Sequence, residues 1–229
     1  ILFDLGRAGV WTNHPAPSDG ESACAAASSG PIEQGTVGVG TGARAGGLKG
    51  GIGSASAVLP SGATVAALVA CNAVGSPFDL ATGEILGARL GVDEEFFDLP
   101  PVDPGRLAAF LAARTEGIAA LVAGQATTIG VVATDATLTK AECAKLADIA
   151  HDGIARAVNP VHTAYDGDTL FALATGDRPA PAGPLGVVEL QAAAADCVSR
   201  AIAHAVLAAV TAGGMASWRD ALTGRAAPT

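Results

Sequence analysis

The sequence has few aromatic and few basic residues, and both shortages restrict what the chain can be. Aromatic side chains make up only 4% of the 229 residues, although 50% of the residues are hydrophobic. Small aliphatic side chains must therefore fill the core, which brings backbones close together. The 13 lysines and arginines are scattered and are outnumbered by 22 acidic residues. The resulting net charge of −9 argues against binding to nucleic acid or to anionic lipid.

Closely spaced cysteines and long uninterrupted apolar runs are also missing. The four cysteines include no Cys-x-x-Cys pair and have no nearby histidine partner, so we expect reduced, mostly buried thiols and neither a metal site nor disulfides. Charges at Glu189, Asp196 and Arg200 interrupt the longest apolar stretch, residues 187–210, which indicates a soluble helix. We expect a cytoplasmic protein with no membrane partner. Because the chain opens at Ile1 on an apolar run, we also expect an upstream piece.

Hydrophobic patterning predicts an α/β protein whose strands and helices alternate without regular βαβ spacing. Strands are expected at residues 1–5, 54–59, 63–71, 128–133 and 169–174, with a hairpin turn at 60–62. Helices are expected at 19–28, at 104–114, from the capping box of Thr139 and Glu142 to before Pro160, and from the 179–184 link to a stop at 213–214. Such an order favours a layered sheet-and-helix body over a doubly wound parallel sheet.

The remaining segments are expected to be connections. Residues 72–104 are rich in glycine, proline and aspartate and carry an acidic cluster of Asp93, Glu94 and Glu95, so we expect an exposed excursion there. Residues 116–126 are expected to lead into the strand that begins at 128. In the predicted helix after 184, Asp196, Arg200 and His204 lie four residues apart on one narrow stripe, which leaves most of its surface apolar for packing.

Two hydroxyl residues, Thr127 and Thr128, lie at the start of a predicted buried strand. Alone, a Thr-Thr pair there is explained by β-propensity. A catalytic interpretation needs a base beside the hydroxyl, because a free hydroxyl is a weak nucleophile. A chain break before Thr127 would supply one in its own α-amine, whose ordinary pKa is ~7.7–8.0.

Two further segments allow either a structural or a catalytic interpretation. Asp166 and Asp168 flank Gly167 before a strand, as in a common turn, but both carboxylates could instead face one site and orient an amine or hold a proton. Lys49 lies in a glycine-dense segment that lacks the order of a phosphate-binding loop; it is either a surface lysine or a group that stabilises negative charge on a carbonyl. Asn72, at a strand end, could cap a turn or donate into an oxyanion hole.

Together and in this order, these segments resemble a family of self-processing hydrolases. Gly-Leu-Lys-Gly-Gly-Ile-Gly-Ser at 47–54, Asn72, Thr-Thr-Ile-Gly-Val-Val-Ala-Thr-Asp-Ala at 127–136 and His-Thr-x-x-Asp-Gly-Asp-Thr-Leu-Phe at 162–171 are similar to those of the N-terminal-nucleophile L-aminopeptidase/D-esterase family. This family includes β-peptidyl aminopeptidases and nylon-oligomer endohydrolases. The similarity covers nearly all of the chain.

The resemblance implies a four-layered αββα sandwich that cleaves itself into subunits 1–126 and 127–229 and assembles into a homo-oligomer, commonly a tetramer. It implies a cofactor-independent hydrolase of small peptides, amino-acid amides or nylon-type oligomers, with Thr127 as nucleophile. Lys49 and Asn72 would support the nucleophile and the oxyanion, and Asp166 and Asp168 would be the acidic positions near the nucleophile.

Three features of the chain differ from the family pattern. Ala126 stands before the nucleophile where Asn or Gly is usual, Phe3 replaces a Tyr, and the amino-terminal third is absent. Slow self-cleavage or an uncleaved form would follow from Ala126. Two other functions remain open: an acyltransferase similar to ornithine acetyltransferases, and a non-catalytic, uncleaved relative.

Overall fold

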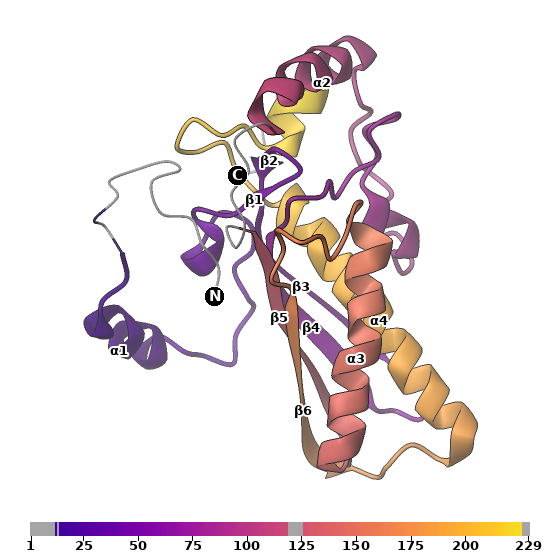
Figure 1. The fold of residues 1–229 in the computed structure, drawn as a ribbon. Coiled ribbons are helices and arrows are strands. Elements are labelled where there is room, and N and C mark those ends of the chain that lie inside the picture. Colours follow the sequence, from indigo (N-terminus) through magenta and orange to yellow (C-terminus); the bar gives the residue numbers. More distant parts are fainter. Residues whose placement is uncertain (1–11, 13, 119–125, 226–229) are drawn as a thin grey trace.

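The fold is taken from a computed structural model that describes residues 12, 14–118 and 126–225 (Figure 1). The strand predicted at residues 1–5, with Phe3, lies outside the described residues, as does most of the predicted connection at 116–126. The rest of the chain forms the predicted mixture of strands and helices.

A single four-stranded sheet organises the molecule. Its strands are β3 (Gly51–Val58), β4 (Thr64–Asn72), β5 (Thr127–Ala136) and β6 (Thr169–Arg178), in the order β3-β4-β5-β6. The β3-β4 and β4-β5 pairs are antiparallel, whereas β6 runs parallel to β5. The predicted hairpin is confirmed: Leu59 donates to Ala63 O at 2.8 Å, and Gly62 has the positive φ of 83° that its turn requires.

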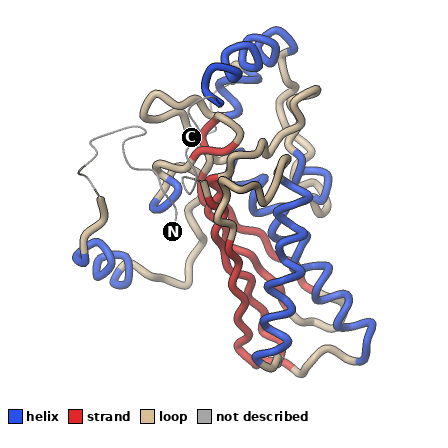
Figure 2. Tube along the Cα trace, viewed as in Figure 1, coloured by secondary structure: helices blue, strands red, loops and turns tan. Residues whose placement is uncertain are grey.

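Two long helices cover one face of this sheet (Figure 2). Helix α3 (Lys140–Ala157) begins at the predicted capping box, in which Glu142 N donates to Thr139 Oγ1 and Thr139 N donates to Glu142 Oε2. Helix α4 (Gly183–Leu207) follows β6. The apolar face of α4 packs mainly on β3 and β4, and the apolar face of α3 packs on β6 and β5. The core formed there includes Val65, Val69, Val132, Leu146, Ala150, Ile154, Val198 and Ile202.

Helix α4 ends earlier than predicted. The glycines at 213–214 were expected to stop it, but its last residue is Leu207. The chain just beyond the helix is held by Thr36, whose hydroxyl accepts from Val210 N at 3.0 Å and lies 3.2 Å from Val210 O. A tertiary contact therefore holds the chain immediately beyond the helix, and local sequence does not reveal such a contact.

Most of the smaller elements gather at one end of the sheet. They are β1 (Arg44–Ala45), β2 (Leu48–Lys49), α2 (Pro104–Ile118), 3-10 helices at Gly38–Gly40 and Leu86–Leu90, and a π-helical turn at Arg219–Thr223. Helix α1 (Pro17–Ala25) lies apart from the sheet (Figure 1) and has no buried residue. The predicted helix at 104–114 is thus confirmed and extends to Ile118. The helix predicted at 19–28 is also present, but it begins at Pro17 and already ends at Ala25, and the Asp19 carboxylate accepts from Ala16 N at 2.7 Å in its first turn.

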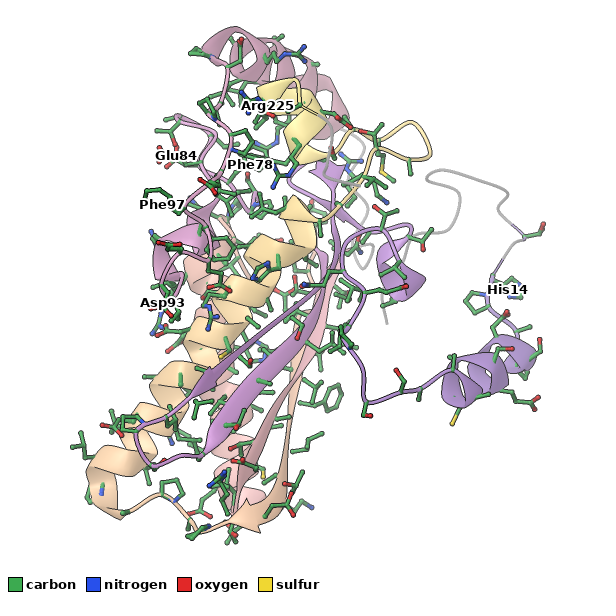
Figure 3. All side chains as sticks on the ribbon, turned by 180° about the vertical axis from the view of Figure 1, so that it is seen from behind. His14, Phe78, Glu84, Asp93, Phe97 and Arg225 are labelled. Atoms are coloured by element: carbon green, nitrogen blue, oxygen red, sulfur yellow. The ribbon has the colours of Figure 1, made fainter. Side chains whose placement is uncertain are left out.

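The expected exposed excursion at 72–104 is partly wrong. Phe78 and Ile85 are buried in a second apolar cluster with Trp218 and Leu222, whereas Phe97 is 84% exposed. Figure 3 shows Phe78 lying inward and Phe97 pointing away from the body. Apolar side chains spaced along this irregular segment anchor it to α4 and to the C-terminal turn.

One residue of the acidic cluster, Glu95, attaches this segment to α4. Glu95 Oε2 lies 2.6 Å from Arg200 Nε, and Glu95 Oε1 lies 2.7 Å from His204 Nε2. Burial raises the pKa of the Glu95 carboxyl, but the hydrogen bonds from Arg200 and His204 outweigh burial and hold that pKa below its usual value. The charged stripe of α4 therefore binds the segment, and Asp196 on the same stripe pairs with Arg156 of α3.

The sheet face opposite the helices is less covered. Side chains alternate between the two faces of a strand, so Phe171 and Leu173 of β6 point away from the helices, and they are 58% and 45% exposed. Apart from the β1-β2 pair, the described residues thus form one four-stranded sheet and one helical layer, and apolar side chains remain on the far side of that sheet.

Glycines set how closely α3, α4 and the sheet approach. A Cβ on Gly153 of α3 would lie 2.2 Å from Ala195 O, and one on Gly53 of β3 would lie 1.9 Å from Ala201 O. Neither backbone oxygen can move without displacing α4. Close packing of backbones, expected from the scarcity of aromatics, is therefore built on particular glycines.

We predict that Gly153→Ala lowers the free energy of unfolding by about 1–3 kcal/mol, because overpacking pushes α3 away from α4. Gly20→Ala is the matched control, since Gly20 is also helical and has nothing within 4 Å of an added Cβ; it should be neutral or stabilising by up to about 1 kcal/mol. Thermal and urea denaturation measure both. Equal stability of the two variants would contradict the packing described.

Candidate active site

Thr127 is the first residue of β5 and pairs with Asn72, the last residue of β4. Directly opposed residues in an antiparallel pair direct their side chains to the same face. The neighbouring pair, Cys71 and Thr128, points toward the helical layer. Because side chains alternate along a strand, Asn72 and Thr127 point to the opposite face. Thr127 is 4% exposed and Asn72 is fully buried. The pairing register thus gives the two adjacent threonines different surroundings.

The Thr127 hydroxyl lies against the peptide bond that precedes it. Thr127 Oγ1 donates to Ala126 O at 2.6 Å, and the same carbonyl oxygen accepts from Gly167 N at 3.0 Å. Gly167 is close enough that an added Cβ would lie 3.1 Å from Thr127 Oγ1. The carbonyl of Ala126 is thus polarised by a backbone N–H while a hydroxyl lies beside it.

Asp168 ties this strand end to the loop before β6. Its Oδ1 accepts from Thr128 N at 2.7 Å, and its Oδ2 lies 2.7 Å from His162 Nδ1. The Asp168 side chain is only 4% exposed. A carboxylate whose two oxygens are both hydrogen-bonded has a fixed orientation. Asp168 therefore places a negative charge beside Thr128, the residue that follows Thr127.

Asp166 holds the other part of the same loop. Its Oδ1 accepts from Val74 N at 3.1 Å, and its Oδ2 accepts from Thr163 N at 3.1 Å and from Thr163 Oγ1 at 2.6 Å. These contacts fit the turn interpretation of Asp-Gly-Asp. They also anchor the loop to the end of β4, which brings Gly167 onto Ala126 O.

Lys49 is fully buried, which is rare for a lysine. Its Nζ donates to Thr41 O, and its backbone N donates to Ala216 O at 2.9 Å. Gly51, two residues later, pairs with Cys71, the neighbour of Asn72, so Lys49 lies at the same end of the sheet as Thr127. The lone surface lysine considered from the sequence is therefore wrong.

Asn72 connects the sheet to the β1-β2 ribbon. Its Oδ1 accepts from Arg44 N at 3.0 Å, and Arg44 pairs with Lys49 across the ribbon. Asn72 therefore links two strands that are distant in the sequence.

The cysteines do not supply a competing nucleophile at this site. Cys71 is adjacent to Asn72, but burial, with Asp168 next in weight, raises the pKa of its thiol to about 12. Burial likewise raises the pKa of Cys197 to about 11. Of the four cysteines, which were expected to be mostly buried, only Cys71 and Cys197 are buried, and Cys24 is exposed. Within the described residues, no three metal-binding side chains converge, and none of the described helices could cross a membrane.

Three residues of the site were not singled out from the sequence. Gly167 and Arg44 contribute backbone N–H groups, which a side-chain motif does not reveal. His162 stands in the Asp-Gly-Asp segment and has a positive φ of 51°, uncommon for a residue with a Cβ. His151 of α3 lies beside it, with ring centroids 5.2 Å apart. Burial, and next the charge of His162, lower the pKa of His151.

Known proteins with similar sequences are aminopeptidases by name. A Mycobacterium bovis protein and a Mycobacterium tuberculosis protein, each described as an uncharacterized aminopeptidase, are 45% identical over 98% of this chain. The Mycobacterium leprae counterpart is 43% identical over 95% of it. The chain spans 66% of the length of the first two relatives and 62% of the third.

Solved structures resemble the fold described above. A Burkholderia sp. beta-aminopeptidase matches with a TM-score of 0.64 and 28% identity over 91% of this chain and 57% of its own. The Ochrobactrum anthropi L-aminopeptidase D-Ala-esterase/amidase, described as a prototype for the serine aminopeptidases and a variant of the Ntn-hydrolase fold, matches with a TM-score of 0.59 and 27% identity over 93% of this chain and 54% of its own. The expected α/β fold of the N-terminal-nucleophile type is confirmed.

Residues 1–219 match the peptidase family S58. This match takes in nearly all of the chain, including every residue of the candidate site, and the chain belongs to peptidase family S58. The family resemblance drawn from the four sequence segments is therefore confirmed.

We predict that His162→Asn raises the pKa of His151 part of the way to its ordinary value, because the repulsive charge is removed while the burial of His151 remains. The pH titration of the histidine ring signals by NMR measures this shift. His14→Asn, a change at an exposed histidine, should leave the pKa of His151 unaltered. An unchanged pKa of His151 in the His162→Asn variant would show that the two rings are not coupled.

Proposed function

We propose that the protein is a self-processing aminopeptidase whose nucleophile is Thr127. The observation that supports this most directly is the 2.6 Å hydrogen bond from Thr127 Oγ1 to Ala126 O, since it places a hydroxyl beside the one peptide bond whose cleavage would free the α-amine of Thr127. Membership of peptidase family S58 and the aminopeptidase names of the relatives agree with this function.

The same contacts support self-cleavage. Thr127 Oγ attacks the carbonyl carbon of Ala126, and its proton passes to the amide nitrogen as the carbon–nitrogen bond breaks, which leaves an ester between Ala126 and Thr127. The oxygen that becomes negative in this step is the one that Gly167 N already contacts at 3.0 Å. Water then hydrolyses the ester, giving subunits 1–126 and 127–229. The methyl side chain of Ala126 does not obstruct any of these contacts.

Turnover of a substrate repeats this chemistry with the freed amine as base. The α-amine of Thr127 takes the hydroxyl proton, Oγ attacks the substrate carbonyl, and the departing amine takes a proton as the acyl group passes to Thr127. Water then releases the acid. The hydroxyl nucleophile of this scheme agrees with the description of the Ochrobactrum relative as a serine aminopeptidase.

Four side chains assist in distinct ways. Lys49 supplies a buried positive charge, and Asn72 supplies an amide NH₂ for the substrate oxyanion. Asp168 is held in place by Thr128 N and His162. Its negative charge favours the protonated form of the Thr127 α-amine after that amine has accepted the hydroxyl proton. Asp166 positions the loop that carries Gly167. No step requires a cofactor.

The substrates that fit this proposal are small peptides, amino-acid amides and nylon-type oligoamides. A β-aminopeptidase and an L-aminopeptidase D-Ala-esterase/amidase are among the similar structures, which supports a site that accepts short amides of varied backbone. We further propose that subunits 1–126 and 127–229 stay together through the β4-β5 pairing and assemble as a homotetramer. Size-exclusion chromatography with light scattering measures the oligomeric state.

We predict that Thr127→Ala lowers kcat/KM for alanine p-nitroanilide by at least about a thousandfold, because the acyl group has no acceptor. Thr127→Ser, which keeps a hydroxyl, should retain measurable activity and accumulate an acyl-enzyme detectable by intact mass. Thr128→Ala, at the neighbouring hydroxyl that faces the helices, should keep the activity. A covalent acyl adduct on Thr127→Ala would overturn the assignment of the nucleophile.

A further inference from the structure

A cleft of about 520 Å³ opens beside the candidate active site. Its walls come from the β1-β2 ribbon, α2 and the C-terminal turn, which Figure 1 shows together at one end of the body. The apolar part of the wall consists mainly of Leu48, Ala109, Phe110, Met215 and Ala216. This volume lies within the usual range for small-molecule sites. Thr127 is not among the lining residues.

Positive charge gathers at this cleft. Arg44 and Arg106 line it, and Arg114 borders it through Gly47, whose added Cβ would lie 3.9 Å from Arg114 Cγ. Three arginines elsewhere, Arg156, Arg178 and Arg200, are paired with carboxylates, whereas Arg89 and Arg219 donate to backbone carbonyls. Within the described part of the chain, no carboxylate pairs with Arg44, Arg106 or Arg114. In a chain of net charge −9, this is a local excess of positive charge.

Two of these arginines, Arg44 and Arg114, lie close enough for their charges to repel each other. Burial, and next the positive charge of Arg44, lower the pKa of Arg114, so the two guanidinium groups repel each other across the cleft edge. Arg106 Nη1 donates to Asp220 O at 3.2 Å, which holds its guanidinium at the rim. Apolar walls between like charges focus the positive potential into the cleft. An anion bound there would relieve the repulsion.

The cleft and the candidate active site share neighbouring residues in the sequence and in space. Leu48 lines the cleft, and the next residue is the buried Lys49. Arg44 donates its backbone N–H to Asn72 Oδ1 at 3.0 Å, and Asn72 is opposite Thr127. A short substrate whose carbonyl lies at Thr127 could therefore extend over the β1-β2 ribbon into the cleft.

We propose that this cleft binds a carboxylate of the substrate, held by Arg44 with Arg106 and Arg114, and that it selects short peptides carrying such a group. The proposal rests on the peptidase function proposed above. Guanidinium groups bind carboxylates with two parallel hydrogen bonds, and the apolar walls accommodate the aliphatic or aromatic part of the residue that carries the acid. The carboxylate comes either from the C-terminus of a peptide or from an acidic side chain.

Two substrate pairs distinguish these sources in the full chain. Ala-Ala against Ala-Ala-amide tests the C-terminal carboxylate, and Glu-Ala-amide against Gln-Ala-amide tests the side chain. The wild-type protein should favour the acid of one pair by about tenfold to a hundredfold in kcat/KM, the effect of one or two charge-assisted hydrogen bonds. Arg44→Gln should bring that ratio close to one. Arg178→Gln, at an arginine paired with Asp135, should preserve the ratio. A wild-type ratio near one in both pairs would overturn the proposal.

A binding measurement separates failure of the cleft from failure of the peptidase function. N-acetylalanine should bind to the wild-type protein by isothermal titration, N-acetylalanine amide should not, and Arg44→Gln and Arg114→Gln should each weaken the binding at least about tenfold. Thermal denaturation establishes that each variant is folded, and Arg114→Gln decides the question if Arg44→Gln is not. Equal binding of acid and amide, or no binding of the acid, would overturn the proposal even if peptides are hydrolysed. Binding without hydrolysis would support the cleft and contradict the peptidase function.

Discussion

The register between β4 and β5 is the constraint on which the candidate site depends. It places Asn72 opposite Thr127 and Cys71 opposite Thr128. A shift of one residue would turn every side chain of a strand to the other face, which would expose Val65, Val69 and Val132 and direct Thr127 into the helical layer. The apolar contacts of these valines with α3 and α4 therefore keep the Thr127 hydroxyl on the face opposite the helices.

The loop before β6 completes the site because β6 runs parallel to β5. Parallel neighbours begin at the same edge of a sheet, so the segment that enters β6 lies beside the segment that enters β5. Asp166 binds Val74 N, Gly167 binds Ala126 O and Asp168 binds Thr128 N. Consecutive residues of one loop thus fix the end of β4, the carbonyl before Thr127 and the amide after it. The α3 crossover, whose length allows the parallel pairing, is therefore as important to the site as the residues themselves.

Sequence patterns predicted the elements whose formation is decided locally. The capping box of Thr139 and Glu142, the turn at Gly62 and the charged stripe of α4 were identified from short-range signals, and the structure contains all three. Errors arose where distant contacts decide. Thr36 holds the chain just beyond α4, which ends before the predicted glycine stop. Glu95 docks on Arg200 and His204, so the segment predicted to be exposed is partly anchored.

In the candidate site too, local sequence predicts some features and distant contacts decide the others. The sequence segments that resemble the family predict five site residues, and the structure places all five at one end of the sheet: Thr127, Lys49, Asn72, Asp166 and Asp168. The contributions of Gly167 and Arg44 come from backbone N–H groups, whose direction depends on the fold. Burial of Lys49 and the paired orientation of His162 and Asp168 likewise required the tertiary structure, because composition and spacing do not specify which polar side chains lose contact with water.

We propose that the hydroxyl of Thr127 acts on the peptide bond before it and then serves as an N-terminal nucleophile. Amino-terminal sequencing of the purified, active protein is the direct test. We expect a chain that begins Thr-Thr-Ile-Gly, residues 127–130, in equal amount with the amino terminus of the preceding subunit. Active protein that contains only chains running intact through Ala126 and Thr127 would contradict it.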